Sequence, residues 1–230
     1  MLGLGLGSGD TPLREILCLG AHSDDIEIGC GGAVLELVAA NPGLRVTWVV
    51  FSGNAKREAE ARRASRQFLR GAGATQVITR QHRDGFFPSQ TTEIKEFFEQ
   101  LKATCSPDLI FTHYRDDRHQ DHRTISDLTW NTFRNHLVLE YEIPKYDGDL
   151  ATPNVFVPVG RRHAQRKVSV LLSAFKSQVG QHWFTPELFF GLMTLRGIEC
   201  CAESGYAEAF HSRKAIVSVA QARKRQARRA

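Results

Sequence analysis

Short, strongly apolar segments alternate along the chain with longer segments in which apolar residues recur every three or four positions. The short segments have the length and the two-sided apolarity of buried parallel strands, and the longer ones have the spacing of amphipathic helices. The predicted strands are 15–20, 45–52, 75–80 and 108–113, and the predicted helices between them are 33–40, 56–70 and 91–105. The alternation predicts an α/β fold with a mostly parallel sheet flanked by helices.

The second half of the chain continues less regularly. A helix is expected after His122 as far as about Asn135, followed by strands at 137–144 and 154–159, helices at 161–178 and 186–199, and a late strand at 213–219. No internal repeat or linker divides the chain. We therefore predict a single domain over residues 14–219, preceded by a flexible leader at 1–13.

The charge of the chain is concentrated at its end. Five basic residues close to the terminus equal the whole formal net charge of +5; they are Arg223, Lys224, Arg225, Arg228 and Arg229. Short basic termini are usually solvated, so we expect a disordered tail at 220–230 and no nucleic-acid partner. No segment reaches the length of about 18 apolar residues that a membrane span requires, and no signal peptide is recognisable. A cytoplasmic protein with free thiols is expected, since its five cysteines are scattered.

Polar clusters follow two of the predicted strands. His22, Asp24 and Asp25 come directly after the strand at 15–20, and the stretch HYRDDRHQDH, residues 113–122, follows the strand that ends at His113. In open parallel sheets, binding sites form outside the carboxyl ends of the strands. The two clusters are therefore expected to converge.

The glycines at 29–32 resemble a phosphate-binding turn into a helix. Their spacing does not fit a dinucleotide motif, and the acidic side chains of Asp24, Asp25 and Glu27 would repel phosphates. The same acidity favours a cation. We expect the glycines to let the backbone turn tightly into the helix that follows.

The residue types in the two clusters suit a catalytic metal. A histidine, an aspartate three positions later and a histidine from a distant loop make three ligands, which leaves the open position that catalytic zinc requires. A neighbouring carboxylate such as Asp24 could take a proton from water. In the second cluster, we expect one histidine to bind metal and another, held by an aspartate, to perform acid–base chemistry.

These motifs resemble a known family. AHSDD followed by GCGG, together with DRHQDH, is similar to the AHPDD and HxDH motifs of the PIG-L or LmbE-like zinc-dependent N-acetylglucosaminyl deacetylases, and REAEARRAS, LRGAG, RDGFF and YAEAF resemble its weaker blocks. The resemblance implies a Rossmann-like sheet with zinc at the strand ends. It makes His22, Asp25 and His122 the Zn²⁺ ligands and Asp24 the general base.

The resemblance also implies roles for other residues. His119 becomes the electrophile and acid, oriented by Asp121. Ser23 and Gln120 stand where the family usually has proline, but neither change removes a ligand or a catalytic group.

Arg57 and Asp84 would hold sugar hydroxyls or an attached group, although Arg62 and Arg63 compete with Arg57 for that role. His113, at a strand end near the site, is expected to support the ligands or the structure and not to bind metal directly. His82 and the other histidines are expected at the surface or in the core. Trp183 and the phenylalanines at 184, 189 and 190 could line a platform for a sugar, but residues at this spacing are expected in the core.

The expected function is a zinc-dependent hydrolase that removes the N-acetyl group from an N-acetylglucosamine-type sugar or sugar conjugate. One alternative is a zinc amidase that cleaves a larger N-acyl or conjugate group. A second is a metal-containing protein without catalytic activity that binds nucleic acid through its basic tail. The expected partner is thus a small N-acetylated amino sugar or glycoconjugate, and a homo-oligomer is left open.

Overall fold

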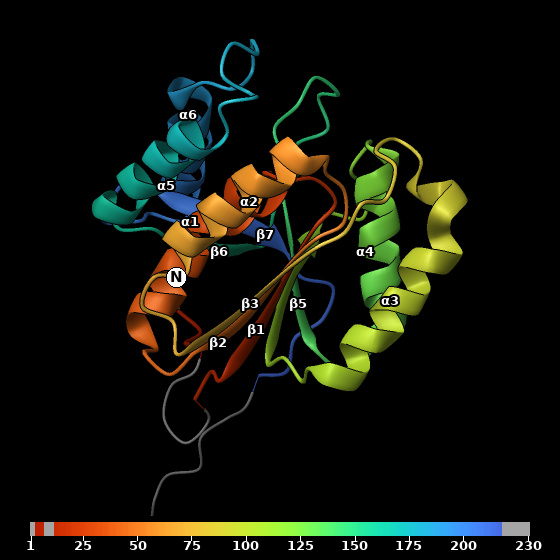
Figure 1. Ribbon diagram of the computed structural model, residues 1–230. Coiled ribbons are helices and arrows are strands. Elements are labelled where there is room, and N and C mark those ends of the chain that lie inside the picture. Colours follow the sequence, from red (N-terminus) through yellow and green to blue (C-terminus); the bar gives the residue numbers. More distant parts are fainter. Residues whose placement is uncertain (1–2, 7–11, 218–230) are drawn as a thin grey trace, which may run out of the picture.

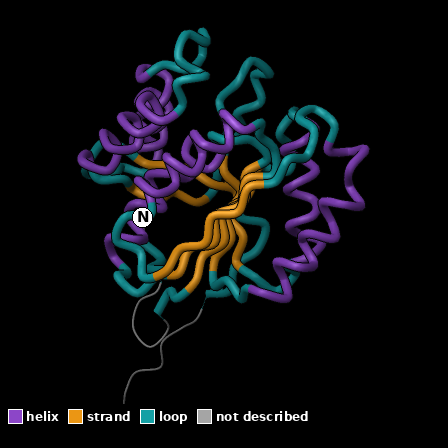
Figure 2. The backbone as a smooth tube through the Cα atoms, viewed as in Figure 1, coloured by secondary structure: helices purple, strands orange, loops and turns teal. Residues whose placement is uncertain are grey.

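The computed structural model describes residues 3–6 and 12–217 and shows one seven-stranded sheet with helices on both faces (Figures 1 and 2). The strands are β1 (Glu15–Gly20), β2 (Arg45–Val50), β3 (Ala74–Thr79), β4 (Leu109–His113), β5 (Leu137–Tyr141), β6 (Val155–Pro158) and β7 (Ala207–His211). The helices are α1 (Asp25–Ala40), α2 (Ala55–Phe68), α3 (Thr91–Thr104), α4 (Gln120–Thr132), α5 (Arg161–Ala174) and α6 (Pro186–Glu199), with a 3-10 turn, η1, at Phe87–Gln90.

The strand order is β3-β2-β1-β4-β5-β7-β6, and the first five strands in this order are parallel. The last two continue the sheet in antiparallel fashion. The predicted α/β fold with a mostly parallel sheet is therefore confirmed. The chain builds outward from β1 to β3 and then returns to β4 on the other side of β1, so the order reverses between β1 and β4. Binding crevices form at such reversals.

Two apolar cores lie on opposite faces of the sheet. Helices α1, α2, α5 and α6 cover one face, and α3 and α4 cover the other (Figure 1). The central strands are buried on both sides, which explains their continuous apolar runs.

The glycines at 29–32 lie within α1, so the predicted turn is wrong: the helix already begins at Asp25. These glycines instead allow other elements to approach the helix closely. A Cβ atom would lie 2.1 Å from the ring of Tyr141 at Gly29, 2.6 Å from Phe68 at Gly31 and 2.9 Å from Glu208 at Gly32. The motif GCGG therefore serves helix packing.

The predicted late strand at 213–219 is also wrong. Residues 213–217 form no strand, residues 218 and 219 lie outside the described part, and the last strand is instead β7. Its sequence, AEAFH, hid it because Glu208 interrupts the apolar run. Glu208 is buried, and its carboxylate accepts hydrogen bonds from the backbone of α1 and from Lys167 Nζ at 2.6 Å.

The chain ends fall largely outside the described residues, including the expected basic tail at 220–230 and residues 1–2 and 7–11 of the expected leader. The described leader residues, 3–6 and 12–13, form neither helix nor strand. None of the helices seen over 12–217 has the length and apolarity to cross a membrane. All five cysteines are free thiols, as expected.

Candidate active site

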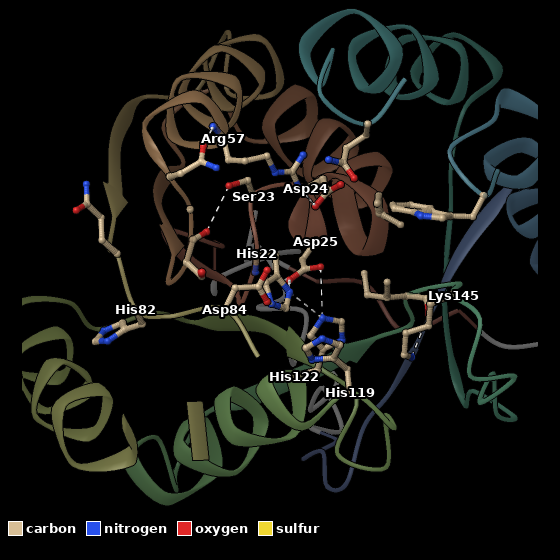
Figure 3. Close-up of a pocket in the computed structure, with 18 of the residues that line it drawn as sticks. His22, Ser23, Asp24, Asp25, Arg57, His82, Asp84, His119, His122 and Lys145 are labelled. Atoms are coloured by element: carbon tan, nitrogen blue, oxygen red, sulfur yellow. Dashed lines mark hydrogen bonds and ion pairs between the residues drawn. The ribbon is translucent and has the colours of Figure 1, made fainter. Parts of the chain in front are cut away.

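A cleft of about 820 Å³ opens at the carboxyl edge of the sheet (Figure 3). Its walls come from the loops that follow all five parallel strands, and they include both polar clusters recognised in the sequence. The clusters meet because β1 and β4 are direct neighbours, with Cys18 paired to Phe111. The convergence predicted from the sequence is therefore present in the structure.

His22, Asp25 and His122 form a compact triangle of donor atoms. His22 Nδ1 lies 3.2 Å from His122 Nε2 and 3.3 Å from Asp25 Oδ2, and His122 Nε2 lies 3.6 Å from Asp25 Oδ1. Zinc–nitrogen bonds of about 2.0–2.1 Å in a tetrahedron place ligand atoms about 3.3–3.4 Å apart. The donor types fit the implied metal, and the two imidazole nitrogens have about this spacing. Asp25 reaches them with different oxygens, Oδ2 toward His22 and Oδ1 toward His122.

The charge states of Asp25 and His122 suit a cation. Burial opposes ionisation of Asp25, but His122, His113 and His22 outweigh it and hold the pKa of this carboxyl well below its usual range. Burial and the neighbouring His113 lower the pKa of His122 to about 4. An ionised carboxylate and a neutral imidazole are the forms that bind metal.

Asp117, which sequence reasoning missed, orients His122. Its Oδ2 lies 2.9 Å from His122 Nδ1, so that His122 Nε2 faces the triangle, and its Oδ1 accepts a hydrogen bond from the backbone N–H of His119 at 2.7 Å. Carboxylates commonly hold metal-binding histidines in this way. The available signal was its position in the same polar cluster, DDRHQDH, ahead of both histidines.

The opposite nitrogen of the His22 ring faces two carboxylates. His22 Nε2 lies 3.1 Å from Asp84 Oδ1 and 3.4 Å from Asp121 Oδ2. Burial disfavours the charged imidazole, but Asp25, Asp121 and Asp84 outweigh this effect and raise the pKa of His22 well above its usual value. Asp84, predicted to contact substrate, does line the cleft, and its side chain is 75% exposed.

Asp24 lies beside the triangle with half of its carboxylate uncommitted. Its Oδ1 accepts a hydrogen bond from Arg57 at 2.7 Å, whereas Oδ2 is buried and has no partner among residues 3–6 and 12–217. Burial raises the pKa of this carboxyl, although Arg57 opposes the shift. Asp24 thus lies at the wall of the cleft with a free acceptor oxygen, as a general base requires.

Arg57 lines the cleft, but the protein itself occupies its guanidinium. Besides Asp24, it donates to Ser177 Oγ at 3.2 Å and lies 3.6 Å from Glu60 Oε2. Ser177 in turn donates to Glu60, which is buried. These contacts favour a role in orienting Asp24 over the predicted contact with sugar hydroxyls, and they add Glu60 and Ser177, which the sequence did not reveal.

The two competing arginines are engaged elsewhere. Arg62 pairs with Glu58 at 3.0 Å, and Arg63 donates to the backbone oxygen of Ala174. Neither is among the residues that line the cleft. Of the three candidates in this helix, the structure places only Arg57 at the site.

The carboxylate of Asp121 does not hold the His119 imidazole, so this predicted contact is wrong. Asp121 accepts hydrogen bonds from the backbone N–H groups of Gly85 at 2.6 Å and Phe87 at 3.1 Å, and it thereby fixes the loop after β3. Its own backbone N–H donates to His119 Nδ1 at 3.2 Å. With Nδ1 accepting, the proton of the neutral His119 ring lies on Nε2, which makes this atom a donor.

His113 lies next to Asp25 and His122, with which it forms one of the close donor groups. It is buried, its Nε2 accepts a hydrogen bond from Ala21 N–H at 2.9 Å, and the same atom is 3.2 Å from Asp25 Oδ2. Tyr141 Oη completes the group at 3.2 Å. By accepting from Ala21 N–H, His113 supports the end of β1 next to Asp25.

Two residues expected at the surface or in the core line the cleft instead. His82 and Trp183 both contribute to its walls, the first from the loop after β3 and the second from the segment between α5 and α6. Trp183 also packs edge-on against Phe184, which is buried as expected. A flat aromatic surface in a polar cleft can hold the apolar face of a sugar ring.

At the carboxyl edge of the sheet, three side chains of metal-binding type lie close together, next to the free carboxylate oxygen of Asp24 and the imidazole of His119. This combination is typical of a metallohydrolase site. Residues 17–133 match the family model described as "PIG-L: GlcNAc-PI de-N-acetylase". The chain belongs to this family, and the resemblance noted in its motifs is confirmed.

Relatives and solved structures agree with this placement. The uncharacterized deacetylase YaiS of Escherichia coli is 29% identical over 140 residues, which cover 57% of this chain and 75% of YaiS. The conserved protein TT1542 of Thermus thermophilus is similar over 92% of this chain and 99% of its own, with a TM-score of 0.70 and 22% identity.

Two further solved structures have the same fold. The N,N'-diacetylchitobiose deacetylase of Pyrococcus horikoshii has a TM-score of 0.64 and 17% identity, covering 87% of this chain and 84% of its own. The 4-carboxy-2-hydroxymuconate hydratase GalB of Pseudomonas putida has a TM-score of 0.65 and 16% identity over 91% and 100% of the two chains. At such identities the likeness concerns the fold, so the activity is argued from the site.

Proposed function

We propose that this protein is a zinc-dependent N-deacetylase that releases acetate from an N-acetylated amino sugar or glycoconjugate. The observation that carries the proposal is the buried, uncommitted Oδ2 of Asp24 beside the donor triangle of His22, Asp25 and His122. Membership of the de-N-acetylase family supports the reaction.

The triangle would hold the metal. Close groups of donor atoms also join His119 to His22 and His122, and His113 to Asp25 and His122. Because His113 Nε2 already accepts the backbone N–H of Ala21, and His119 Nε2 is assigned to the substrate, we assign the metal to His22, Asp25 and His122. Zinc, when bound, polarises the acyl carbonyl and lowers the pKa of water. The other requirements of amide hydrolysis fall to residues of the chain.

Asp24 and His119 divide the proton transfers between them. Asp24 Oδ2 accepts a proton from the attacking water, while Arg57 keeps the carboxylate in place from its other oxygen. His119 Nε2–H points its proton toward the cleft side of the site and stabilises the oxygen that becomes negative as water adds. The carbon–nitrogen bond then breaks, and the leaving amine takes the Nε2 proton of His119, which the proton accepted by Asp24 replaces. Acetate and a free amino sugar result.

The cleft itself supports a carbohydrate substrate. Its walls carry the amide side chains of Asn54, Gln81 and Gln178 together with Trp183, groups that bind sugar hydroxyls and a sugar face. Its volume of about 820 Å³ lies in the upper part of the range of about 300–1,000 Å³ usual for ligand sites. This size admits an attached group as well as one sugar ring, and it also leaves room for the alternative, an amidase that cleaves a larger acyl group.

The test incubates the zinc-loaded protein with N,N'-diacetylchitobiose, other N-acetylglucosamine conjugates and matched substrates with longer acyl chains, and measures the released acid. Acetate release is expected to be fastest. Asp24→Asn should retain zinc and lose nearly all turnover, whereas His122→Ala should lose the metal. Unchanged acetate release by Asp24→Asn would refute the mechanism, and faster release of longer acids would favour the amidase.

A further inference from the structure

One oxygen of Asp117 has two partners. Lys145 Nζ lies 2.9 Å from Asp117 Oδ2, the same oxygen that lies 2.9 Å from His122 Nδ1. The side chains of Asp117 and His122 are buried, and that of Lys145 is 14% exposed at the wall of the cleft. The buried carboxylate of Asp117, which contacts His122, is therefore paired with a cation, Lys145, from the loop after β5.

The remaining contacts of Lys145 tie two loops together. Its ammonium also lies 2.5 Å from Asp149 Oδ2 and 3.4 Å from the backbone oxygen of Ile143. Asp149 Oδ2 in turn accepts a hydrogen bond from Arg118 N–H at 2.7 Å. Lys145 and Asp149 thereby clamp the segment between β4 and α4, which carries His119 and leads into the first turn of α4 with His122.

The contacts of the Lys145 ammonium indicate a structural role and not a contact with substrate. A lysine ammonium has three donors, and the three acceptors on Asp117, Asp149 and Ile143 can engage all of them. Lys145 lies at the wall of the cleft (Figure 3), and its ammonium contacts these three groups. It is thus placed to act on the site from behind His122.

We propose that Lys145 is a positioning residue for the metal site: as the counter-ion of Asp117, it fixes the carboxylate that holds His122 with Nε2 toward the metal. The inference rests on the metal site of the proposed function. Without the cation, the buried carboxylate loses the partner that fixes its position, so that His122 is no longer held in one orientation. Changes in such supporting contacts typically weaken metal binding about 10–100-fold.

The test is a double-mutant cycle on zinc affinity, measured by competition with a chromophoric chelator. Lys145→Met and Asp117→Asn are each expected to raise the zinc dissociation constant about 10–100-fold. Because Lys145 acts through Asp117, the double variant should bind zinc about as weakly as Asp117→Asn alone. Lys145→Arg, which keeps the cation, should restore most of the affinity.

Controls separate positioning from other roles. Lys102→Met removes the same charge at the opposite edge of the sheet and should leave zinc binding unchanged. Circular dichroism and melting of each metal-free variant establish that it is folded, and Lys145→Gln replaces Lys145→Met if the latter is not. Because zinc affinity is measured without substrate, the cycle remains decisive even if no deacetylation is found.

Two results would overturn the inference. In the first, Lys145→Met binds zinc like the wild type and raises KM for N,N'-diacetylchitobiose, which would make Lys145 a substrate contact. In the second, the effects of the two single changes multiply in the double variant, which would show that Lys145 and Asp117 act independently. At saturating zinc, the positioning role predicts a KM near that of the wild type.

Discussion

The glycine at position 29 offers a direct test of how α1 packs, because an added methyl group has no room. In Gly29→Ala, the new Cβ would lie 2.1 Å from Tyr141 Cδ2, far inside van der Waals contact. Tyr141 is fully buried, and its hydroxyl donates to the backbone oxygen of Leu19 at 2.6 Å. The ring cannot move aside without straining that hydrogen bond.

The expected loss follows from three contributions. Alanine is favoured over glycine in a helix by about 1 kcal/mol. Overpacking a core costs about 1–3 kcal/mol, and leaving a buried polar group without its hydrogen bond costs about 1–3 kcal/mol more. We therefore expect Gly29→Ala to lower the free energy of unfolding by about 1–5 kcal/mol, out of the 5–15 kcal/mol typical of a native protein.

Urea unfolding of the metal-free protein measures this change. The matched control is Gly191→Ala in α6, where nothing lies within 4 Å of the added Cβ. That change should stabilise the protein by about 0.5–1 kcal/mol through helix propensity alone. If Gly29→Ala were as stable as the wild type, or gained stability like the control, the close approach of Tyr141 to α1 would be refuted.

Two further predictions concern the chemistry of the site. Arg57→Leu removes the group that fixes one oxygen of Asp24 but leaves the donor triangle intact. The value of kcat should therefore fall about 100-fold, while zinc affinity, measured by chelator competition, stays the same. A change in KM alone would instead support the predicted contact of Arg57 with the sugar. Removing the metal with a chelator should abolish turnover and lower the melting temperature, because a ligand present at 100 times its dissociation constant stabilises the native state by about 2.7 kcal/mol. Added zinc should reverse both losses, and an unchanged melting temperature would contradict the site.

The sequence was informative where local pattern and local chemistry coincide. The central strands are apolar on both faces, so their positions and the parallel sheet could be predicted without knowledge of tertiary contacts. The same holds for His22, Asp24 and Asp25, which lie within one short stretch directly after β1. The structure brings these residues together with the second cluster because their strands are neighbours.

Prediction failed where the deciding contact joins distant parts of the chain. Gly29 looks like a turn residue, and only the ring of Tyr141, far along the sequence, explains why a helix needs glycine there. β7 was not predicted because it contains Glu208, and the residue that pairs with this buried carboxylate, Lys167, lies on α5. The contact of Arg57 with Ser177 could not be foreseen for the same reason, since the two residues lie far apart in the sequence.

Contacts between distant parts of the chain also decide which aspartate orients which histidine of the site. Asp121 is two residues from His119, so a carboxylate–imidazole contact was the natural expectation. Its carboxylate instead turns to the backbone N–H groups of Gly85 and Phe87, since that loop would otherwise leave these donors unsatisfied beside the cleft. Asp117 takes over by holding His122.

The position of β7 between β5 and β6 also bears on the order in which the protein folds during synthesis. The five parallel strands, which carry both histidine clusters, are complete by residue 141, whereas β6 pairs only with β7 and therefore waits until residues 207–211 are available. Until then β5 presents an open edge, and Lys167 lacks Glu208, its buried anionic partner. The nascent chain thus passes through a stage in which the metal-binding edge can assemble while the sheet beside it is still unclosed and open to wrong pairing.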